Sequence, residues 1–374
     1  MKNYEPGLEK RSIRVPRGEL RPPLFMPDAT FGFVRSLDAV DLKRCGIQAV
    51  VMNVFHLMQS PGSSVIQGLG GLHGFSGWDR PIITDSGGFQ AYSLIRQNSG
   101  SGNITKRGIL FRPKNFNRKL LLTPEKSIQL QLRYGSDLLI CLDDCTHVDD
   151  PRETQMESVD RTIHWAERCK SEFTKLIRQR GTHDAVRPLL FAVVQGGGSY
   201  DLRRNSAEAL LEMGFNGYAY GGYPLDNEGN LLASMMRYTR ELIPREFPMI
   251  ALGVGEPRNI VKCIEMGYEL FDSSLPTRDA RQGRLYVFKS DLYHERAWEE
   301  KGIGYLYIRD MKHIKDKGPV SPHCDCLTCS EHSLAFLHHL YEMKDPLYFR
   351  LATIHNLRFM TLLVEHMKGP SDEC

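Results

Sequence analysis

Three cysteines lie within six residues near the end of the chain, in the segment Cys324-Asp325-Cys326-Leu327-Thr328-Cys329. This spacing is typical of a tight knuckle in which three thiolates bind one metal ion, and tetrahedral zinc then needs a fourth ligand. Because three thiolates and one imidazole leave no open position on zinc, we expect a structural site and not a catalytic one. Spacing alone leaves the fourth ligand open among five histidines: His355 in a later segment, and the closer His323, His332, His338 and His339.

Carboxylates follow several short apolar runs, where they could do acid–base or nucleophilic chemistry. Asp85 opens the segment Asp85-Ser86-Gly87-Gly88-Phe89-Gln90, whose two glycines let the backbone approach a ligand closely, although a plain glycine turn is an equally good interpretation. Asp143 and Asp144 follow another run, and adjacent residues of a strand point in opposite directions. We therefore expect one of these two acids to face a cavity and the other to bind a helix or solvent.

Two further polar positions continue this pattern. Gln195 precedes three glycines, and Asp272 ends an apolar run and is followed by the arginine-rich segment Pro276–Arg284. Several carboxylates at one site favour double displacement at an anomeric carbon, in which one ionised acid attacks and another exchanges a proton with the leaving group. The alternative is that these acids bind a metal ion or cap helices. Guanidinium groups suit phosphate, so the arginines favour a phosphate-bearing substrate.

The elements that would position these residues alternate along the chain. Helical patterns that end just before a glycine lie between β-rich runs, and such a glycine takes the left-handed conformation without steric cost. Strands that alternate with helices predict βαβ units, so eight strands predict a closed (β/α)₈ barrel whose active site lies where the strands end. The eight runs are Leu24–Met26, Ala49–Met52, Ile82–Thr84, Asp137–Cys141, Leu189–Val194, Gly217–Tyr220, Met249–Leu252 and Glu269–Phe271, and the clearest helical patterns are Ser36–Cys45, Thr123–Tyr134, Ser199–Met213 and Glu256–Met266.

Other segments depart from the barrel pattern. Two short alternating runs within Ser99–Leu122 predict an inserted hairpin, Pro61–Gly77 is glycine-rich without periodicity, and Asp150–Gly181 predicts a long charged helix. After the eighth strand a basic, mixed segment leads to the cysteine cluster and to two helices split at Asp345-Pro346. We therefore expect an α/β chain in two parts. Residues 1–283 form an irregular (β/α)₈ TIM barrel, and residues 284–374 form a zinc-binding subdomain with C-terminal helices that pack on the barrel.

The composition excludes several classes of protein. The 374 residues include 48 Lys+Arg and 45 Asp+Glu, a net charge of +3, with 41% hydrophobic and 25% charged residues. These values are ordinary for a globular protein and exclude disordered, collagen-like and coiled-coil chains. An odd total of nine cysteines argues against a disulfide framework. No apolar run approaches the ~20 residues that span a bilayer, and the first residues lack the apolar core of a secretion signal, so we expect a cytoplasmic protein.

Taken in order, these segments resemble the tRNA-guanine transglycosylases over nearly the whole chain. The resemblance implies an irregular (β/α)₈ barrel with a zinc subdomain and no membrane association. It also implies an enzyme, expected to be a homodimer, that exchanges guanine at the wobble position (34) of GUN-anticodon tRNAs (those for aspartate, asparagine, histidine and tyrosine) for a 7-deazaguanine in queuosine modification. The motifs that carry it are Phe25-Met26-Pro27, Asn53-Val54-Phe55-His56-Leu57, Thr84-Asp85-Ser86-Gly87-Gly88-Phe89-Gln90, Val194-Gln195-Gly196-Gly197, Gly253-Val254-Gly255-Glu256, Phe271-Asp272, Leu275-Pro276-Thr277-Arg278 and the cysteine cluster with its later histidine.

The resemblance also implies roles for individual residues. Asp272 matches the nucleophile that attacks C1′ of the wobble nucleotide and forms a covalent aspartyl-ribosyl intermediate, and Asp85 matches the acid/base. Arg278 and Arg281 match contacts to the anticodon loop. The residues that match the base pocket are Asp143, Gln195, Gly222, Ser86 and Cys145, with Phe89 and Leu252 as the lids between which the base stacks, and those that match the ligands of one structural Zn²⁺ per subunit are Cys324, Cys326, Cys329 and His355.

One loop departs from the family pattern. After Gly221-Gly222 the family continues with small residues and a glutamate, whereas this chain has Tyr223-Pro224-Leu225-Asp226-Asn227. In the family this loop surrounds the 7-substituent of the incoming base. Pro224 removes a backbone N–H, and Asn227 cannot supply the carboxylate that would bind the aminomethyl group of preQ1. Both preQ1 and queuine remain open as the base, and the altered loop slightly favours queuine.

Two other functions are alternatives to this enzyme. One is a non-catalytic partner subunit that only binds tRNA, and the presence of Asp85, Asp143 and Asp272 argues against it. The other is a retaining glycosidase built on a barrel, which would give no role to the cysteine knuckle.

Overall fold

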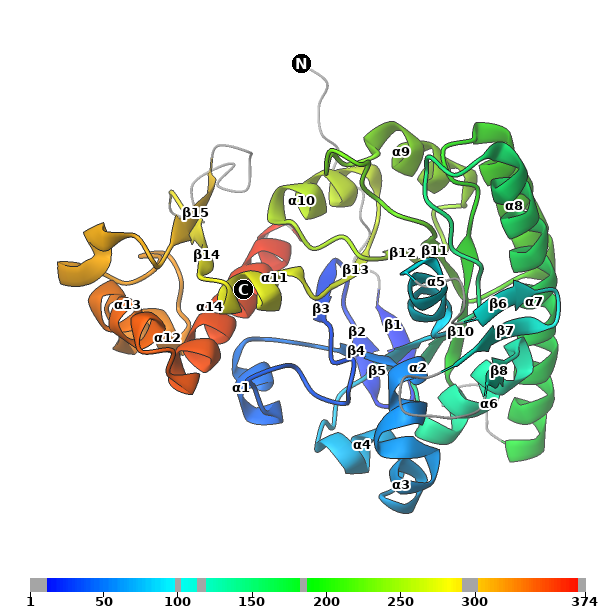
Figure 1. Cartoon of the computed structure of the whole chain (residues 1–374), viewed down its shortest axis with the longest axis horizontal. Helices are drawn as coiled ribbons and strands as arrows, with labels where there is room; N and C mark the ends of the chain where they lie inside the picture. Colours follow the sequence, from blue (N-terminus) through cyan, green and yellow to red (C-terminus); the bar gives the residue numbers. More distant parts are fainter. Residues whose placement is uncertain (1–11, 98–101, 113–118, 182–186, 291–301, 369–374) are drawn as a thin grey trace.

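The computed structural model describes residues 12–97, 102–112, 119–181, 187–290 and 302–368. The eight predicted barrel strands are all present, and Figure 1 shows them at the centre of the larger part of the molecule. Their bounds are β3 Leu24–Pro27, β4 Val50–Asn53, β5 Ile82–Asp85, β9 Leu138–Ile140, β10 Leu189–Val194, β11 Gly217–Tyr220, β12 Met249–Ala251 and β13 Leu270–Ser273. They form one parallel sheet in the order β3-β13-β12-β11-β10-β9-β5-β4.

This sheet closes on itself between β3 and β4, the two strands at the ends of that order. The N–H of Ala29 donates to the carbonyl of Val51 at 2.7 Å, and Asp28 pairs with Val51 as a parallel bridge. All eight strands then surround one interior, and each is followed along the chain by helical structure. The prediction of an irregular (β/α)₈ barrel is therefore confirmed.

Apolar side chains from alternate positions of the strands fill the barrel. Each strand contributes at least one of them, such as Leu24 and Met26 of β3 or Leu270 of β13. A hairpin that the sequence did not predict, β1 (Ile13–Val15) with β2 (Gly18–Leu20), adds its own apolar residues to this cluster. The hairpin precedes β3 and covers the amino ends of the strands, so that only their carboxyl ends remain for a site.

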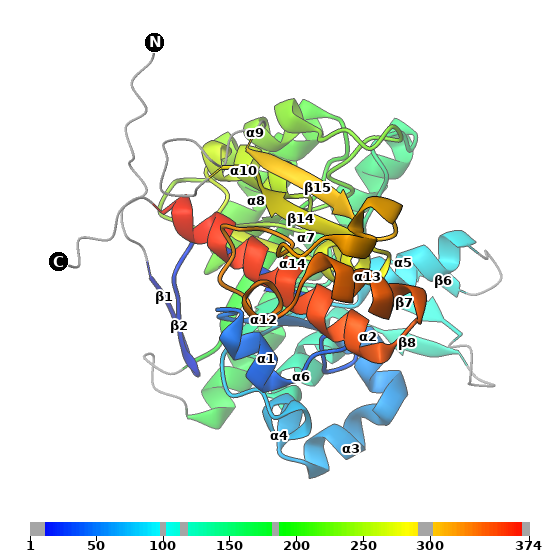
Figure 2. The same cartoon turned by 90° about the vertical axis from the view of Figure 1, so that its left-hand side faces the viewer.

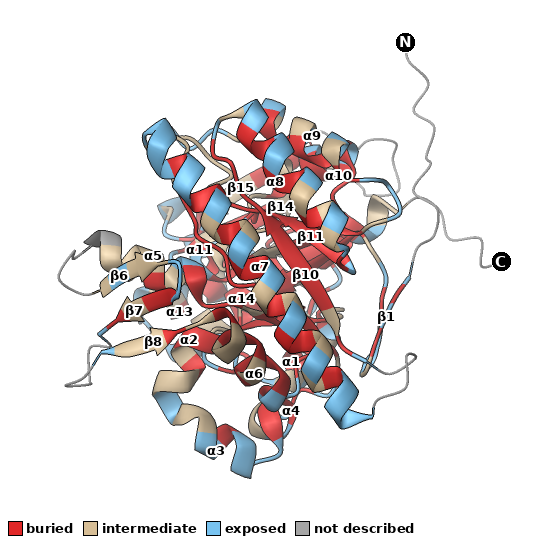
Figure 3. Cartoon of the chain, turned by 90° about the vertical axis from the view of Figure 1, so that its right-hand side faces the viewer, coloured by how far each residue is buried: buried red, intermediate tan, exposed pale blue. Residues whose placement is uncertain are grey.

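Helices surround the barrel, with buried faces toward the strands and exposed faces outward, as Figure 3 shows most clearly for α7. Thr123 begins α6 by accepting from the N–H of Lys126 at 3.2 Å, and Gly135 ends it at φ 82°, as predicted. The helices are α1 Ala39–Arg44, α2 Val54–Leu57, α5 Gly88–Gln97, α6 Pro124–Tyr134, α7 Arg152–Arg180, α8 Tyr200–Met213, α9 Ala233–Leu242, α10 Pro257–Met266 and α11 Leu275–Arg281.

Some elements differ from their predicted form. The helix expected from Ser36 begins only at Ala39, because Ser36 has φ 71° and the side chain of Asp38 caps the N–H of Asp41 at 2.9 Å. The glycine-rich segment forms short helices: η1 Met58–Gly62, α3 Ser63–Gly68 and α4 Gly71–Ser76. The inserted hairpin is present as β7 (Gly108–Phe111) and β8 (Leu120–Leu122), and β6 (Gly102–Thr105) adds an unpredicted third antiparallel strand.

The C-terminal part packs beside the barrel. It consists of the antiparallel pair β14 (Arg284–Phe288) and β15 (Ile303–Tyr307), then η4 (Met311–Lys315), α12 (Leu327–Glu331), α13 (Leu334–Glu342) and α14 (Pro346–His366). The two helices split at Asp345-Pro346 are as predicted, since the side chain of Asp345 caps the start of α14. Figure 2 shows α14 crossing this part of the molecule, with β14 and β15 on one side and α1 on the other, and α14 contacts both α11 and β3. Among the described residues, no helix combines the length and apolarity needed to cross a membrane.

Candidate functional site

The alternation of side chains along each strand places a set of polar residues at the barrel mouth. Ile83 of β5 and Leu270 of β13 face the barrel interior, so Asp85 and Asp272, two residues later, face the same way at the carboxyl end. Gln195 follows Val193 of β10 in the same manner. The structure therefore brings the predicted catalytic acids together at one end of the barrel.

Asp85 is held by two side-chain amides. Its Oδ2 accepts from Nδ2 of Asn53 at 2.6 Å and from Nε2 of Gln90 at 3.3 Å. Its Oδ1 is buried and has no hydrogen-bond partner among the described residues. Burial raises the pKa of Asp85 to about 8, against the Asn53 hydrogen bond, and the charges of Asp28 and Asp272 raise it further. At neutral pH this carboxyl therefore carries a proton that it can donate.

Asp272 has a different environment at the end of β13. Its Oδ1 accepts the N–H of Gly253 at 3.2 Å. Burial raises the pKa of Asp272 to about 7, the Gly253 hydrogen bond opposes this, and the charge of Asp28 adds to it. Asp272 and Asp85 are thus two buried acids of raised pKa at one site, a pair that can act as nucleophile and proton donor.

Asp143 forms a second polar group with Ser86 and Gln195. Its Oδ2 accepts from Nε2 of Gln195 at 2.8 Å and its Oδ1 from the hydroxyl of Ser86 at 3.4 Å. Burial raises the pKa of Asp143 to about 6, with the Gln195 hydrogen bond opposing, so it is ionised at neutral pH. A Cβ on Gly88 would lie 2.6 Å from the carbonyl oxygen of Asp143, so this position of the Asp85–Gln90 segment needs a glycine.

Asp144, the neighbour of Asp143, points the other way, as the sequence predicted. Its carboxylate pairs with Arg161 of α7, its N–H donates to the hydroxyl of Thr162 at 3.0 Å and its carbonyl accepts from the hydroxyl of Ser158. These contacts fix the strand end on the helix. Asp143 is therefore free to face the barrel mouth.

Buried acceptors without partners also gather near Asp143. Gln195 Oε1 and Thr146 Oγ1 have no hydrogen-bond partner among the described residues. A Cβ on Gly222, which has φ 88°, would lie 3.6 Å from that Gln195 oxygen, so backbone and amide are adjacent. Cys145 is buried beside Thr146, and burial raises the pKa of its thiol, which is neutral. Unsatisfied buried acceptors indicate a place for a ligand that brings hydrogen-bond donors.

Aromatic side chains lie at the rim of this group. Phe89 is 43% exposed at the start of α5, and its ring centroid lies 5.4 Å from that of Tyr223, which in turn lies 5.0 Å from the ring of His147. Leu252, the other predicted lid, is partly buried and packs against the barrel-interior cluster. The rim thus offers a flat face at Phe89 and an apolar one at Leu252.

The polar side chains of the loop that departs from the family pattern are bound to neighbouring groups. The carboxylate of Asp226 accepts the N–H groups of Glu228 and Asn230, at 2.9 and 2.8 Å. The exposed side chain of Asn227 donates to the carboxylate of Asp149. Tyr223, at the start of the loop, contacts the rim at Phe89 and His147.

The two arginines of α11 differ in their surroundings. Arg278 is exposed, while Arg281 is half-buried and its Nη1 has no hydrogen-bond partner among the described residues. Burial lowers the pKa of Arg281, and the charges of Arg35 and Arg278 lower it further. Three guanidinium groups therefore lie near one another, with Asp28 close to Arg281, and such a cluster attracts anions.

The predicted metal ligands meet in one cluster. The ligand atoms of Cys324, Cys326, Cys329 and His355 all lie within 4.8 Å of one another. His355 Nδ1 lies 3.5 Å from the sulfur of Cys326 and 3.3 Å from that of Cys329, while its Nε2 lies 2.7 Å from the carbonyl oxygen of Tyr286. That carbonyl requires a proton on Nε2, which leaves the Nδ1 lone pair toward the sulfurs, as in metal sites with an ordered outer shell. Three sulfurs and one imidazole nitrogen are a donor set that suits zinc.

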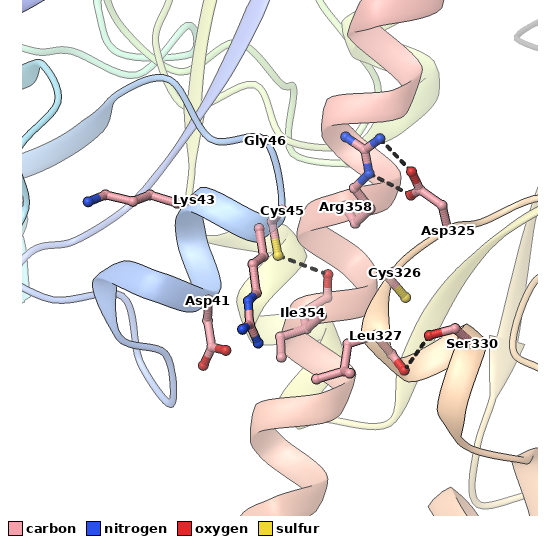
Figure 4. A pocket seen from close by; sticks show the side chains of 11 residues that line it. Asp41, Lys43, Cys45, Gly46, Asp325, Cys326, Leu327, Ser330, Ile354 and Arg358 are labelled. Atoms are coloured by element: carbon pink, nitrogen blue, oxygen red, sulfur yellow. Dashed lines mark hydrogen bonds and ion pairs between the residues drawn. The ribbon is translucent and has the colours of Figure 1, made fainter.

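A pocket of about 410 Å³ lies beside this cluster, between α1 and the cysteine loop (Figure 4). Its charged groups are largely paired already. Arg358 donates to both carboxylate oxygens of Asp325, at 2.6 and 2.8 Å, and Arg350 binds Asp41 through two bonds. These ion pairs join α1, the cysteine loop and α14. We therefore interpret the pocket as a gap between packed elements.

Three residues at the mouth received no individual role in the sequence analysis. Asn53 and Gln90 hold Asp85, and Asp28 lies close enough to act on both catalytic acids. Alternation along the strands could have found Asp28, because it follows Leu24 and Met26 at the same spacing that joins Leu270 to Asp272. The contacts of Asn53 and Gln90 depend on how helices α2 and α5 begin, which the sequence pattern does not specify.

Comparisons with known proteins show the family of this chain. The family model described as queuine tRNA-ribosyltransferase matches residues 11–369. The queuine tRNA-ribosyltransferase of Psychrobacter sp. (strain PRwf-1) is 37% identical over 369 residues, which cover 99% of this chain and 91% of that protein. Those of Novosphingobium aromaticivorans and Francisella tularensis subsp. tularensis are each 36% identical, over 96% of this chain and 90% and 91% of theirs. The chain belongs to the queuine tRNA-ribosyltransferase (TGT) family.

Proposed function

We propose that this protein is a tRNA-guanine transglycosylase, which exchanges guanine at the wobble position of GUN-anticodon tRNAs for a 7-deazaguanine. The observation that carries the proposal is the pair of acids at the barrel mouth, with the pKa of Asp272 at about 7 and that of Asp85 at about 8. Membership of the family and the names of the relatives support the same reaction.

In the first half of the proposed reaction, the ionised carboxylate of Asp272 attacks C1′ of the wobble ribose. The bond from C1′ to guanine breaks as the bond from C1′ to the Asp272 oxygen forms, and the proton of Asp85 goes to the leaving guanine. In the second half, Asp85 removes a proton from the incoming base, whose nitrogen attacks C1′ and releases Asp272. Two inversions at C1′ keep the β configuration.

The base is recognised by its hydrogen-bonding edge in this proposal. Guanine presents N1–H and N2–H₂ donors, and the ionised carboxylate of Asp143 accepts both, whereas adenine would leave it unpaired. The free oxygen of Gln195 and the backbone at Gly222 lie beside Asp143 to complete the set. Stacking on Phe89, with Leu252 as the opposite lid, returns about 1–3 kcal/mol of the few kcal/mol that extruding a base from the anticodon loop costs.

The incoming base carries its 7-substituent toward the loop that begins at Tyr223. The carboxylate of Asp226 is occupied by backbone N–H groups, and the amide of Asn227 is bound to Asp149, so neither is placed to bind an ammonium group. Tyr223 offers an aromatic face instead. This arrangement supports queuine over preQ1 as the base.

The remaining expectations concern the RNA, the metal and the assembly. Arg278 and Arg281 contact phosphates of the anticodon loop, which positions the RNA without reading its sequence. One Zn²⁺ held by Cys324, Cys326, Cys329 and His355 cross-links the cysteine loop to α14, a structural role. We further propose that the subdomain begins after Gly283 and that the protein acts as a homodimer, as expected from the family.

Incorporation of radiolabelled guanine into tRNA tests this function directly. Wild-type protein should incorporate label, and Asp272→Asn should not, although it should still bind tRNA because no phosphate contact is removed. A denaturation-resistant band of protein joined to RNA should form with wild type alone. If neither protein incorporates label and both bind tRNA equally, the chain is instead a non-catalytic tRNA-binding subunit.

A further inference from the structure

Asp28 is a carboxylate at the barrel mouth to which the proposed reaction gives no role. It directly follows β3, where Leu24 and Met26 face the barrel interior, and the alternation of side chains places Asp28 on the same side. In the sheet register Met26 lies opposite Asp272 and Pro27 opposite Ser273, so Asp28 lies one step beyond the nucleophile's strand end. Its position therefore continues the circle of inward residues to which Asp85 and Asp272 belong.

The contacts that Asp28 makes within its own turn use only one of its two carboxylate oxygens. Asp28 Oδ1 accepts the N–H of Thr30 at 2.9 Å and also its hydroxyl, which stabilises the turn beside the bridge to Val51. Asp28 Oδ2 makes no hydrogen bond to any residue that the structure describes. An asparagine or a serine would serve the turn equally well. The negative charge itself thus needs another explanation.

The charged and titratable groups that face Asp28 come from four elements. Asp85 of β5 and Asp272 of β13 both feel its charge, as do His56 of α2 and Arg281 of α11. Burial lowers the pKa of His56, so this imidazole is neutral at working pH and does not cancel the carboxylate. Arg281 is itself flanked by Arg35 and Arg278. Asp28 therefore attracts Arg281 and opposes ionisation of the two acids, Asp85 and Asp272.

We propose that Asp28 is a positioning residue for the proton of the exchange reaction, acting through Asp85 and Asp272 and without touching the reacting atoms. Its charge disfavours ionisation of its two neighbours, so that Asp85 still holds a proton at neutral pH when guanine leaves. Without Asp28, burial and the charge of Asp272 would have to keep that proton in place. The proposal rests on the proposed function, because it assigns Asp85 as the proton donor.

The test is the pH profile of kcat/KM for guanine exchange in Asp28→Asn and Asp28→Ser, which remove the charge and keep an acceptor for the turn. The acidic limb reports ionisation of Asp272 and the alkaline limb that of Asp85. Both limbs should move to lower pH, by roughly 0.5–1 unit for a charge several ångströms away at an effective dielectric constant of 20–40. Asp28→Glu should return the limbs toward their wild-type positions.

Two control variants separate charge from structure. Thr30→Val removes the hydroxyl that binds Asp28 and keeps the charge, and Asp79→Asn removes an exposed acid that pairs with Lys43. Neither should move the limbs. If Asp28→Asn and Asp28→Ser lower the rate at every pH while both limbs stay in place, Asp28 is only structural and the proposal is wrong.

A measurement without turnover separates this proposal from the proposed function. Carbon-13 NMR of aspartate-labelled protein follows the two carboxyl groups, which Asp85→Asn and Asp272→Asn assign. Both should titrate at lower pH in Asp28→Asn than in wild type. This result would hold even for a protein that incorporates no guanine, whereas unchanged titrations in an active enzyme would overturn the role of Asp28 alone.

Discussion

Asn53 Nδ2 lies 2.6 Å from Oδ2 of Asp85, and Oδ1 of the same asparagine accepts the N–H of His56 at 2.9 Å. One side chain therefore both begins helix α2 and holds the proposed acid/base. The amide donates to the ionised form of Asp85 and opposes the effect of burial on its pKa. Asn53 thus links the folding of a helix to the protonation state of the site.

Asn53→Ala should raise the pKa of Asp85 above its present value of about 8, because it removes a hydrogen bond to the charged form. The alkaline limb of kcat/KM should move to higher pH, while the acidic limb, which belongs to Asp272, stays. Loss of the helix cap should cost about 1 kcal/mol of stability. Asn53→Asp is the matched variant. It keeps the cap acceptor and adds a negative charge, so it should move the alkaline limb to a still higher pH. An alkaline limb that moves to lower pH in either variant would contradict the assignment.

The stability of the protein should depend on pH through Asp85. The pKa of this group is about 8 in the folded state, well above the 3.8 of a free aspartate, so the folded state binds more protons between these values. Its contribution is fully present below pH 4 and is lost as pH rises through 8. Asp85→Asn should therefore gain melting temperature relative to wild type as pH is raised from 5 to 9. Asp79→Asn, at an exposed site, is the control and should show no such trend. If Asp85 is ionised over this whole pH range, Asp85→Asn should show no trend either.

Removal of the metal should destabilise the C-terminal part. His355→Ala should lower the zinc content below one ion per chain and lower the melting temperature, because three thiolates would lose the ligand that joins them to α14. His339→Ala, an exposed histidine of α13, is the control and should retain full zinc. Elemental analysis and calorimetry measure both effects. Full zinc in His355→Ala would mean that another residue completes the site.

The positions of the barrel strands could be predicted from sequence because each strand is a short apolar run buried on both faces. The polar residues at their carboxyl ends could also be predicted, since Asp85, Gln195 and Asp272 follow such runs directly. The metal cluster could be predicted only in part. Three cysteines within six residues indicate zinc, but spacing could not select His355, because that choice depends on how α14 packs against the cysteine loop.

The rest depended on long-range contacts that leave little local signal. The hairpin β1–β2 has strands of three residues, too short to show a period, and it is stabilised by the barrel interior that it covers. Strand β6 pairs with β7 although its own residues are only half-buried. Alternation along β3 places Asp28 inward, but its proximity to both acids depends on closure of the barrel, which brings β3 beside both β13 and β4.

The loop from Tyr223 to Asn227 should determine which base is incorporated. Competition of guanine, preQ1 and queuine for exchange into one tRNA should show queuine preferred over preQ1, because the loop offers an aromatic ring and no free carboxylate. Tyr223→Ala should lower kcat/KM for queuine about tenfold, the loss expected for one stacking contact, and leave that for guanine nearly unchanged. Tyr307→Ala removes an exposed tyrosine of β15 and is the control.

Asn227→Glu tests the same loop in the opposite direction. The glutamate cannot donate to Asp149 as Asn227 does, and repulsion between the two carboxylates should release the loop from its present anchor. A carboxylate freed in this way can approach the ammonium group of preQ1, so the ratio of kcat/KM for preQ1 to that for queuine should rise. If wild type already prefers preQ1, and if neither loop variant changes that ratio, base selection must lie elsewhere in the pocket, with Cys145 and Leu252 as the next positions to exchange.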